Sequence, residues 1–310
     1  MDGMHRIRHR LLGCAGLFAL ALAVAVPGAQ AAGRWSGDIK DTVKEAFQVR
    51  PGGTLTVEVN QGAIHVKTRP GNRVLIEVER IAAAETREEA KGILKHHRLQ
   101  FEQQGDNVTV ESRVDDEDAG LWGRWRNHKR LDVRVYVYVP EQYNVEFSSG
   151  FGNVRVEGVT GTVEGSTGAG SIAIGDVRGV VEVSTGSGNV NVTGELERAE
   201  VETGAGNVKL RGLTGAVDVE TGAGNIVAEI TRQPTHDSSL ESGAGNVTVY
   251  LGDAIGAYVD ASAGMGSANC AYPLPVEGEW VSRSFEGEVN GGGPELRMRA
   301  GVGNVSLKKL

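Results

Sequence analysis

Five carboxylates recur at a fixed spacing in the second half of the chain. Each stands four residues before the first glycine of a G-x-G pair, and neighbouring members are 18 residues apart: Glu146, Glu164, Glu182, Glu200 and Asp218. If equivalent positions lie above one another, these groups form an acidic column. Carboxylate oxygens in such a column suit weak Ca²⁺ binding. They also suit acid and base roles in cleaving a glycan, if one of them has a raised pKa.

Repulsion between neighbouring carboxylates limits what this column can be. Two like charges 4 Å apart cost about 1 kcal/mol in water and more near protein. Glu202, Glu220 and Glu241 add further charge two residues along. We therefore interpret the column as a hydrated face, with weak Ca²⁺ binding as the alternative and no firm metal site.

A second segment combines aromatic and basic side chains. The stretch LWGRWRNHKR places Trp122, Arg124, Trp125 and Arg126 close together in an otherwise acidic chain. Such a combination suits stacking on sugars or contact with anionic headgroups, so the segment is a candidate surface contact. The alternative is a loop that packs a tryptophan onto the end of the fold.

The common catalytic motifs are absent from the sequence. It contains no H-E-x-x-H, no G-x-S-x-G and no paired cysteines, and its seven histidines are scattered. Gly186-Ser187-Gly188 and its equivalents lack the third glycine and the following helix of a dinucleotide site. The sequence therefore predicts no catalytic residue and no cofactor, and it favours a protein that is not an enzyme.

Repeated glycines explain why the carboxylates recur. The first glycines of the G-x-G pairs are separated by 18 residues four times, then by 21, 21 and 37: Gly150, Gly168, Gly186, Gly204, Gly222, Gly243, Gly264 and Gly301. A fixed period near twenty is typical of a stacked array whose units bury their apolar faces against one another. We expect equivalent positions of successive units to lie directly above one another.

Each unit has the pattern of one coil of a β-solenoid. Apolar and polar residues alternate on both sides of the turn cluster T-G-A-G-N, as in Val217 and Val219 before it or Val208 and Leu210 after it. Glycine permits the positive φ of a tight turn. An asparagine recurs after the turn and is predicted to form a structural ladder of stacked amides: Asn153, Asn189, Asn207, Asn225, Asn246 and Asn304.

Residues 32–140 follow a less regular pattern. They contain one degenerate coil at 55–66, further strand-like stretches, and a helical period from Glu85 to Gln100. Pro140 is expected to mark the entry into the regular coils. The predicted divisions are a signal peptide (1–31), a β-rich region with one helix that starts the solenoid (32–140) and regular solenoid repeats (141–310).

The first residues have the features of an export signal. Arg6, Arg8 and Arg10 precede an apolar run that ends at the small-x-small site Ala29-Gln30-Ala31. Its removal, which also takes away Asp2, lowers the net charge from −8 to −10 and argues against nucleic acid as a partner. No other run is long enough to span a membrane. We expect an exported protein of the periplasm, cell surface or medium.

The chain resembles the bacterial putative-adhesin family of β-strand-repeat domains, which has no established function. The resemblance rests on Val135-Tyr136-Val137-Tyr138-Val139-Pro140, on the repeated V-x-V-x-T-G-x-G-N-V-x-V and on the helix-like Glu88–Leu94 before Val108-Thr109-Val110. It covers most of residues 50–310. It implies a β-helix in an exported or envelope-associated protein without established catalysis, and it supplies no catalytic residues.

These observations predict an all-β fold, a β-solenoid of about 18-residue coils with one short α-helix in the N-terminal part. A right-handed β-helix is favoured, because no six-residue repeat of the left-handed type is present. The predicted function is a non-catalytic exported envelope protein with an adhesin-like or scaffold surface. Its expected partner is an envelope glycan or another envelope protein. The alternative is a carbohydrate-active β-helix enzyme that uses carboxylates on the solenoid face.

Overall fold

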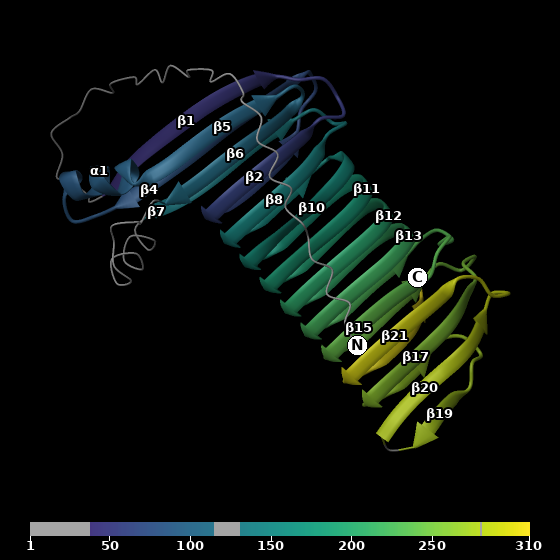
Figure 1. Cartoon of the computed structure of the whole chain (residues 1–310). Helices are drawn as coiled ribbons and strands as arrows, with labels where there is room; N and C mark the ends of the chain where they lie inside the picture. Colours follow the sequence, from purple (N-terminus) through teal and green to yellow (C-terminus); the bar gives the residue numbers. More distant parts are fainter. Residues whose placement is uncertain (1–37, 115–130, 280) are drawn as a thin grey trace, which may run out of the picture. The chain divides into compact units, whose positions relative to one another are not determined.

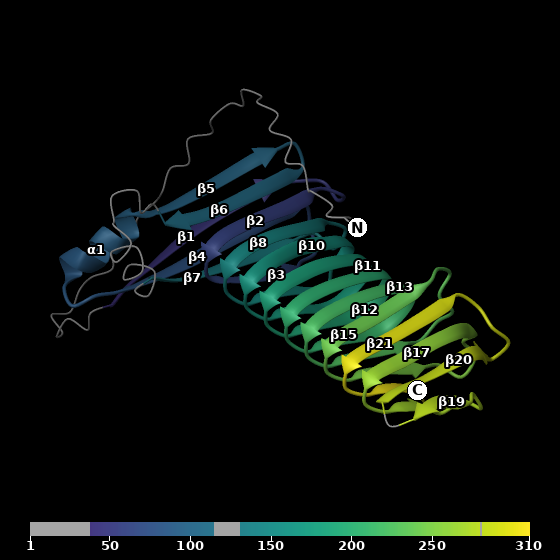
Figure 2. The same ribbon diagram turned by 60° about the horizontal axis from the view of Figure 1, so that its bottom comes forward.

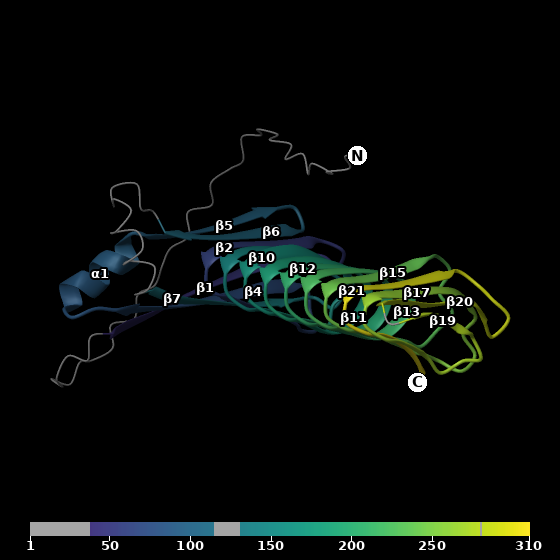
Figure 3. The ribbon, with the colours of Figure 1, turned by 90° about the horizontal axis from the view of Figure 1, so that it is seen from below.

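The computed structural model describes residues 38–114, 131–279 and 281–310. Over these residues the chain forms two layers of β-strands, seen edge-on in Figure 3 and from one side in Figure 1. The predicted all-β solenoid and its short N-terminal helix are confirmed. No helix in these ranges is long and apolar enough to cross a membrane.

Each coil contributes one strand to each layer. We name one layer the first face. The coils contribute these strands to it: β2 (Thr54–Gln61), β8 (Asn144–Phe151), β10 (Thr160–Ala169), β15 (Ser238–Ala244), β21 (Glu295–Val302) and β17 (Ala257–Met265). The second face contains β3 (Ala63–Thr68), β9 (Val154–Glu157), β14 (Ile226–Ile230), β16 (Val247–Leu251), β22 (Val305–Lys309) and β18 (Ala268–Cys270). Three long strands bend at a corner and serve both faces: β11 (Ile172–Ser187), β12 (Val190–Ala205) and β13 (Val208–Ala223).

Parallel pairing keeps the 18-residue coils in register. Val190 pairs with Val208 and Val208 with Ile226, and all three side chains are at most 1% exposed. Figure 2 shows the successive strands of the first face lying side by side. Burying a Val or Leu side chain contributes roughly 1.5–3 kcal/mol, so repeated apolar columns hold the coils together without a disulfide.

The tight turns bring the backbones of neighbouring coils very close. Gly224 has φ of +151°, and a Cβ atom built on it would lie 1.9 Å from the carbonyl oxygen of Gly206 in the next coil. No side chain fits at that distance. Buried Thr221 donates its hydroxyl to the same Gly206 oxygen at 3.2 Å, which satisfies a carbonyl at the turn.

The order of the coils departs from the order of the chain at both ends. The coil of β2 and β3 pairs directly with β8 and β9, so residues 69–143 form an insertion between these two neighbours. At the other end, β21 and β22 lie between the coil of β15 and β16 and the coil of β17 and β18. The expectation that coils stack in chain order is therefore correct for the 18-residue coils and wrong at the C-terminal end.

Additional strands and the helix extend both ends. They are β1 (Asp38–Gln48), β4 (Arg73–Ala83), α1 (Arg87–Lys95), β5 (His97–Gln104), β6 (Asn107–Val114) and β7 (Leu131–Val139) at one end, and β19 (Val276–Glu279) and β20 (Val281–Val289) at the other. Thr86 caps α1 by accepting a hydrogen bond from the Glu89 N–H at 3.2 Å. The predicted helix over Glu85–Gln100 was too long, because residues 97–104 instead pair antiparallel with β6.

Candidate functional site

The five predicted carboxylates lie in one row on the outer side of the first face. Cross-strand pairing aligns Glu146 with Glu164, Glu164 with Glu182, Glu182 with Glu200, and Glu200 with Asp218. Adjacent strands are about 4.8 Å apart, so the carboxylates form a dense negative row. A second row contains Glu202, Glu220 and Glu241, which pair in the same way.

Local partners offset part of this charge. Arg198 places Nη2 3.0 Å from Oε2 of Glu200, and the pKa of Arg198 is raised by this partner. The pKa of Asp218 is raised from its ordinary value, first by partial burial and then by the nearby charges of Glu200 and Glu241. A negative charge on Asp218 is therefore less favourable in the folded protein than in water.

The described residues contain no group of three or more His, Cys, Asp or Glu side chains that could hold a metal ion. The carboxylates of the row project from parallel strands and do not converge on one point, as the six to eight oxygens around Ca²⁺ must. Weak Ca²⁺ binding along the row stays a prediction.

A groove of about 570 Å³ lies where the acidic row ends. Beyond Asp218 the row continues with Ser239 and then Arg297. The groove is lined by residues of β11, β12, β13, β15 and β21 and of the segment between β14 and β15; they include Arg198, Ala216, Asp218, His236, Ser239 and Arg297.

The size of the side chains explains why the face is hollow here. Ala216, Ser238 and Ser239 are small and lie between strands that carry the long side chains of Arg198 and Arg297. In the neighbouring coils β12 and β13 turn the corner as continuous strands, whereas residues 231–237 form a loop between β14 and β15. The groove therefore forms where the 18-residue period lengthens to 21.

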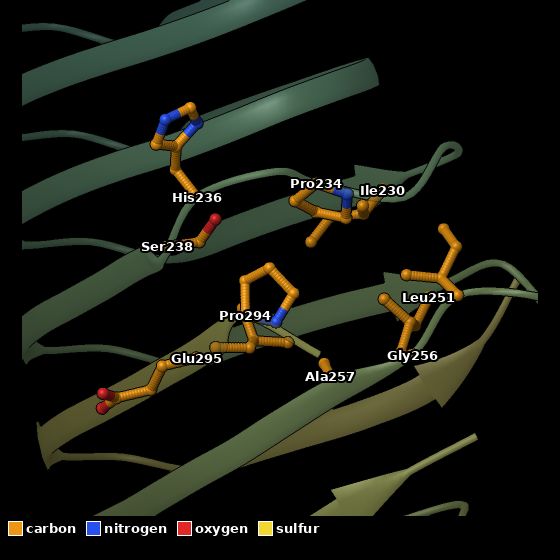
Figure 4. Close-up of a pocket in the computed structure, with 11 residues that line it drawn as sticks. Ile230, Pro234, His236, Ser238, Leu251, Gly256, Ala257, Pro294 and Glu295 are labelled. Carbon is orange, nitrogen blue, oxygen red and sulfur yellow. The ribbon is translucent and has the colours of Figure 1, made fainter. Parts of the chain in front are cut away.

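Hydrogen bonds fix the loop and the floor of the groove. The Val217 N–H donates to Oγ of Ser238 at 3.2 Å, and the Glu295 N–H donates to Oδ1 of Asp237 at 2.8 Å. Beneath the loop is a cavity of about 10 Å³. Figure 4 shows Ile230, Pro234 and Pro294 among its lining residues, while the carboxylate of Glu295 points away from it. That cavity has room for a single water molecule at most.

The charges in the groove are mixed, and both of its arginines are paired. Arg198 is bound to Glu200, and Arg297 is bound to Glu295 through Nη2 at 2.8 Å. His236 lies 2.9 Å from the hydroxyl of Thr235. No aromatic ring other than the His236 imidazole is among the residues that line the groove. The surface therefore offers many hydrogen-bond donors and acceptors without a concentrated charge or a stacking platform.

Of the predicted site residues that the structure describes, only Asp218 lines the groove. The six asparagines lie along the turn edge and bond from coil to coil, as in the Asn207 Nδ2 donation to Oδ1 of Asn189 at 3.1 Å. Trp122, Arg124, Trp125 and Arg126 lie outside the described residues. Sequence reasoning did not bring together Arg198, His236 and Arg297, although the change of period between Gly222 and Gly243 marks the place.

The fold and the polar outer face define a β-solenoid protein with a candidate binding face. The family model described as Toastrack DUF4097 matches residues 54–308, and the chain belongs to this family. A comparison with curated proteins gave no match.

Solved structures that are similar to the chain come from several bacteria. A "putative adhesin" of Bacteroides fragilis NCTC 9343 is 13% identical with a TM-score of 0.50, and the alignment covers 86% of this chain and 97% of that one. A "putative cell adhesion protein" of Clostridium sporogenes ATCC 15579 is 16% identical with a TM-score of 0.30, covering 87% and 100%. A "putative lipid binding protein" of Parabacteroides distasonis ATCC 8503 is 11% identical with a TM-score of 0.42, covering 87% and 97%. At 13% identity and a TM-score of 0.50, the likeness to the Bacteroides fragilis protein shows the fold alone.

Proposed function

We propose that the chain is a non-catalytic, exported envelope protein whose groove on the first face binds a glycan. The groove itself carries the proposal. Its volume of about 570 Å³ lies within the range of ordinary ligand sites, and its walls are side chains held on paired strands. The export signal expected in residues 1–31 and the adhesin names given to solved relatives are consistent with such a role.

The shape and charge of the groove favour a hydroxyl-rich chain. Arg198 and Arg297 are three strands apart, so the groove extends roughly 14 Å along the solenoid axis. Carboxylates outnumber arginines among the lining residues, which disfavours a strongly anionic polymer. Since aromatic platforms are missing, hydrogen bonds to hydroxyl groups would supply the binding energy.

Filling the groove tests this proposal. Ala216→Trp places a bulky ring on the groove floor, and Ala173→Trp is the matched control on the outer side of the second face. Binding is measured by affinity electrophoresis against separate neutral and acidic polysaccharides. We expect binding to a neutral polysaccharide that Ala216→Trp weakens at least tenfold and Ala173→Trp leaves unchanged. Equal binding by both variants, or no binding by the unaltered protein, contradicts the proposal.

One observation favours the alternative of a carbohydrate-active enzyme. Asp218 has a raised pKa, lies in the groove and has Glu200 on the adjacent strand. Glycoside cleavage uses two nearby carboxyl groups, of which the acid has a raised pKa. Incubation with the same polysaccharides distinguishes the two functions. New reducing or unsaturated ends that disappear in Asp218→Asn would establish catalysis, whereas unchanged polysaccharide supports a binding protein.

A further inference from the structure

The two faces of the solenoid end at different levels at the N-terminal end. Beyond β2, the first face continues with β6 and then β5, where it stops. Beyond β3, the second face continues with β7, β4 and then β1. Because β2 and β3 belong to one coil, the second face is one strand longer. β1 therefore has no strand opposite it among the described residues.

This offset leaves apolar side chains incompletely covered. Ile39, Val43 and Phe47 of β1 point toward the interior but are only half-buried, whereas Val74 and Val78 on the neighbouring β4 are fully buried. On the first face, Leu99 and Phe101 of β5 are also half-buried. The free edges of β1 and β5 border this apolar surface, which we name the open end.

At the opposite end of the solenoid, other residues of the chain cover the overhanging strands. There the first face extends past the second by β20 and β19. The inward side chains Phe285 and Val289 of β20 are nevertheless 1% and 2% exposed. Residues 271–275 fold beneath them, with Tyr272 8% exposed and its hydroxyl bonded to the Leu251 carbonyl at 3.3 Å. One overhang is covered by the chain itself. At the other, α1 contacts β1, β4 and β5, yet Ile39, Val43 and Phe47 stay half-buried.

We propose that the open end binds the open end of a second copy of this chain, forming a two-fold dimer. β5 is antiparallel to β6, which is parallel to β2, so β5 runs opposite to β2. β1 and β7 are both antiparallel to β4, and β7 is parallel to β3, so β1 runs parallel to β3. Because β3 returns on the other face of the coil, β1 also runs opposite to β2. β1 and β5 therefore run in the same direction. A two-fold axis parallel to these strands places β1 of each copy beside β5 of the other, so the dimer has two equivalent β1–β5 contacts. Such an isologous contact closes on itself.

The offset of one strand is what makes this arrangement fit. Each β1 fills the empty position opposite the other β1, so that Ile39, Val43 and Phe47 of the two copies cover each other. Both faces then continue through the pair as uninterrupted sheets, with two new parallel β1–β5 pairings. β5 contains neither Lys nor Pro, which often block strand addition at an edge. β1, in contrast, carries Lys40 and Lys44 on its outer side and Asp41 and Glu45 on its inner side.

Two inward carboxylates of β1 also enter the contact. Asp41 is bound by Arg80 of β4 within the same molecule. Glu45 points inward and would face its own counterpart in the second copy. The dimer therefore places two like charges near each other, and Glu45→Gln should strengthen it severalfold.

Disulfide trapping tests the geometry. Nε2 of Gln103 donates to the carbonyl oxygen of Gln48 at 2.6 Å, which aligns the ends of β5 and β1. Counting back four residues from the last residue of each strand, Gln48 and Gln104, brings Lys44 of one copy level with Gln100 of the other, both pointing outward. Within one molecule these residues lie on opposite faces. In a Cys270→Ser background, Lys44→Cys with Gln100→Cys should give a covalent dimer, whereas either substitution alone should not, because the two-fold axis puts identical residues on opposite faces.

Mass measurement by light scattering completes the test. The unaltered chain should be a dimer, Val43→Asp should convert it to a monomer, and the outward control Thr42→Asp should leave it dimeric. If Val43→Asp does not fold, judged by its circular dichroism melting curve, the disulfide result decides. A monomeric mass at all concentrations overturns the proposal, as does a dimer in which the double-cysteine variant is not cross-linked. Glycan binding by a monomer would leave the proposed function intact.

Discussion

The side-chain amide of Asn304 donates a hydrogen bond to Oδ1 of Asn246, 58 residues earlier in the chain, at 2.9 Å. The coil that lies between them in sequence is on the far side of Asn304, where the Ser267 N–H donates to Oδ1 of Asn304 at 2.9 Å. The hydrogen bonds along the row of asparagines thus follow the order in which the coils stack, which differs from their order in the sequence. The last coil of the chain is enclosed between two earlier ones.

Removing one amide from this row should have a measurable cost. Asn246→Ala removes the side-chain bond to Asn225 and leaves the Asn304 N–H without the Asn246 oxygen as acceptor. Because the row is exposed and water replaces part of each bond, we expect a loss of about 1 kcal/mol in the free energy of unfolding, measured by urea titration. Asn191→Ala on the outer side of the second face is the control. An equal loss in both variants would contradict a structural role for the row.

Glycine substitutions should distinguish close backbone approach from ordinary conformational preference. Gly224→Ala places a Cβ atom 1.9 Å from the Gly206 oxygen, so neighbouring coils must separate. We expect a loss of about 3 kcal/mol or more, since a residue with φ of +151° is also strained. Gly92→Ala in α1 has nothing within 4 Å and should stabilise the protein by about 0.5–1 kcal/mol through helix propensity.

Thermal unfolding of the two glycine variants measures both effects on one protein. The melting temperature should fall in Gly224→Ala and rise slightly in Gly92→Ala. Similar changes of the same sign would mean that the turn does not require glycine.

The solenoid could be predicted because its causes are local and repeated. A period of 18 residues, alternating apolar positions such as Val190 and Val192, and glycine turns each determine the structure of one coil, and identical coils stack in register. The enclosed position of the last coil could not be predicted, because it depends on pairing between Val247 and Val305, which have no local signal.

The groove escaped prediction for a related reason. Arg198, Ser239 and Arg297 come from three different coils, and the hollow results from the small volume of the side chains between them. Only the lengthened period near Pro234 marks the place in the sequence. The helix was overextended because the 3.6-residue pattern continues past Lys95, whereas β6 requires an antiparallel partner that residues 97–104 provide.

Charge removal in the acidic row should stabilise the protein. The pKa of Asp218 is raised by burial and by its acidic neighbours, so its charged form disfavours folding at neutral pH. Asp218→Asn should therefore raise the free energy of unfolding by about 0.5 kcal/mol after allowance for solvent screening. The gain should shrink in high salt.

Calcium titration of the same variant examines the weak binding predicted from the row. If the row binds Ca²⁺, millimolar calcium raises the melting temperature of the unaltered protein more than that of Asp218→Asn, and chelator reverses the effect. Identical curves with calcium and with chelator would exclude a role for the ion.

His97 should make the protein less stable in acid. The ring is buried, with Nε2 2.9 Å from Oγ of Ser112 and Nδ1 3.5 Å from Nη1 of Arg80. Burial first, and then the charge of Arg80, lower the pKa of His97 from 6.5 to about 4. Between these values the unfolded chain binds a proton that the folded protein excludes, so stability falls as the pH drops from about 6.5 to about 4. The full difference corresponds to about 3 kcal/mol.

His97→Gln tests this dependence because an amide can keep a hydrogen bond to Ser112 and does not titrate. Urea unfolding near pH 7 and near pH 4 should show a smaller loss of stability for this variant than for the unaltered protein. Carboxylates also titrate in that range, so the comparison concerns the difference between the two proteins. His236→Gln, at an exposed position, should follow the unaltered protein. If His97→Gln loses as much stability in acid as the unaltered chain, then His97 is not the group that resists protonation, and the carboxylates around Arg80 must account for the loss.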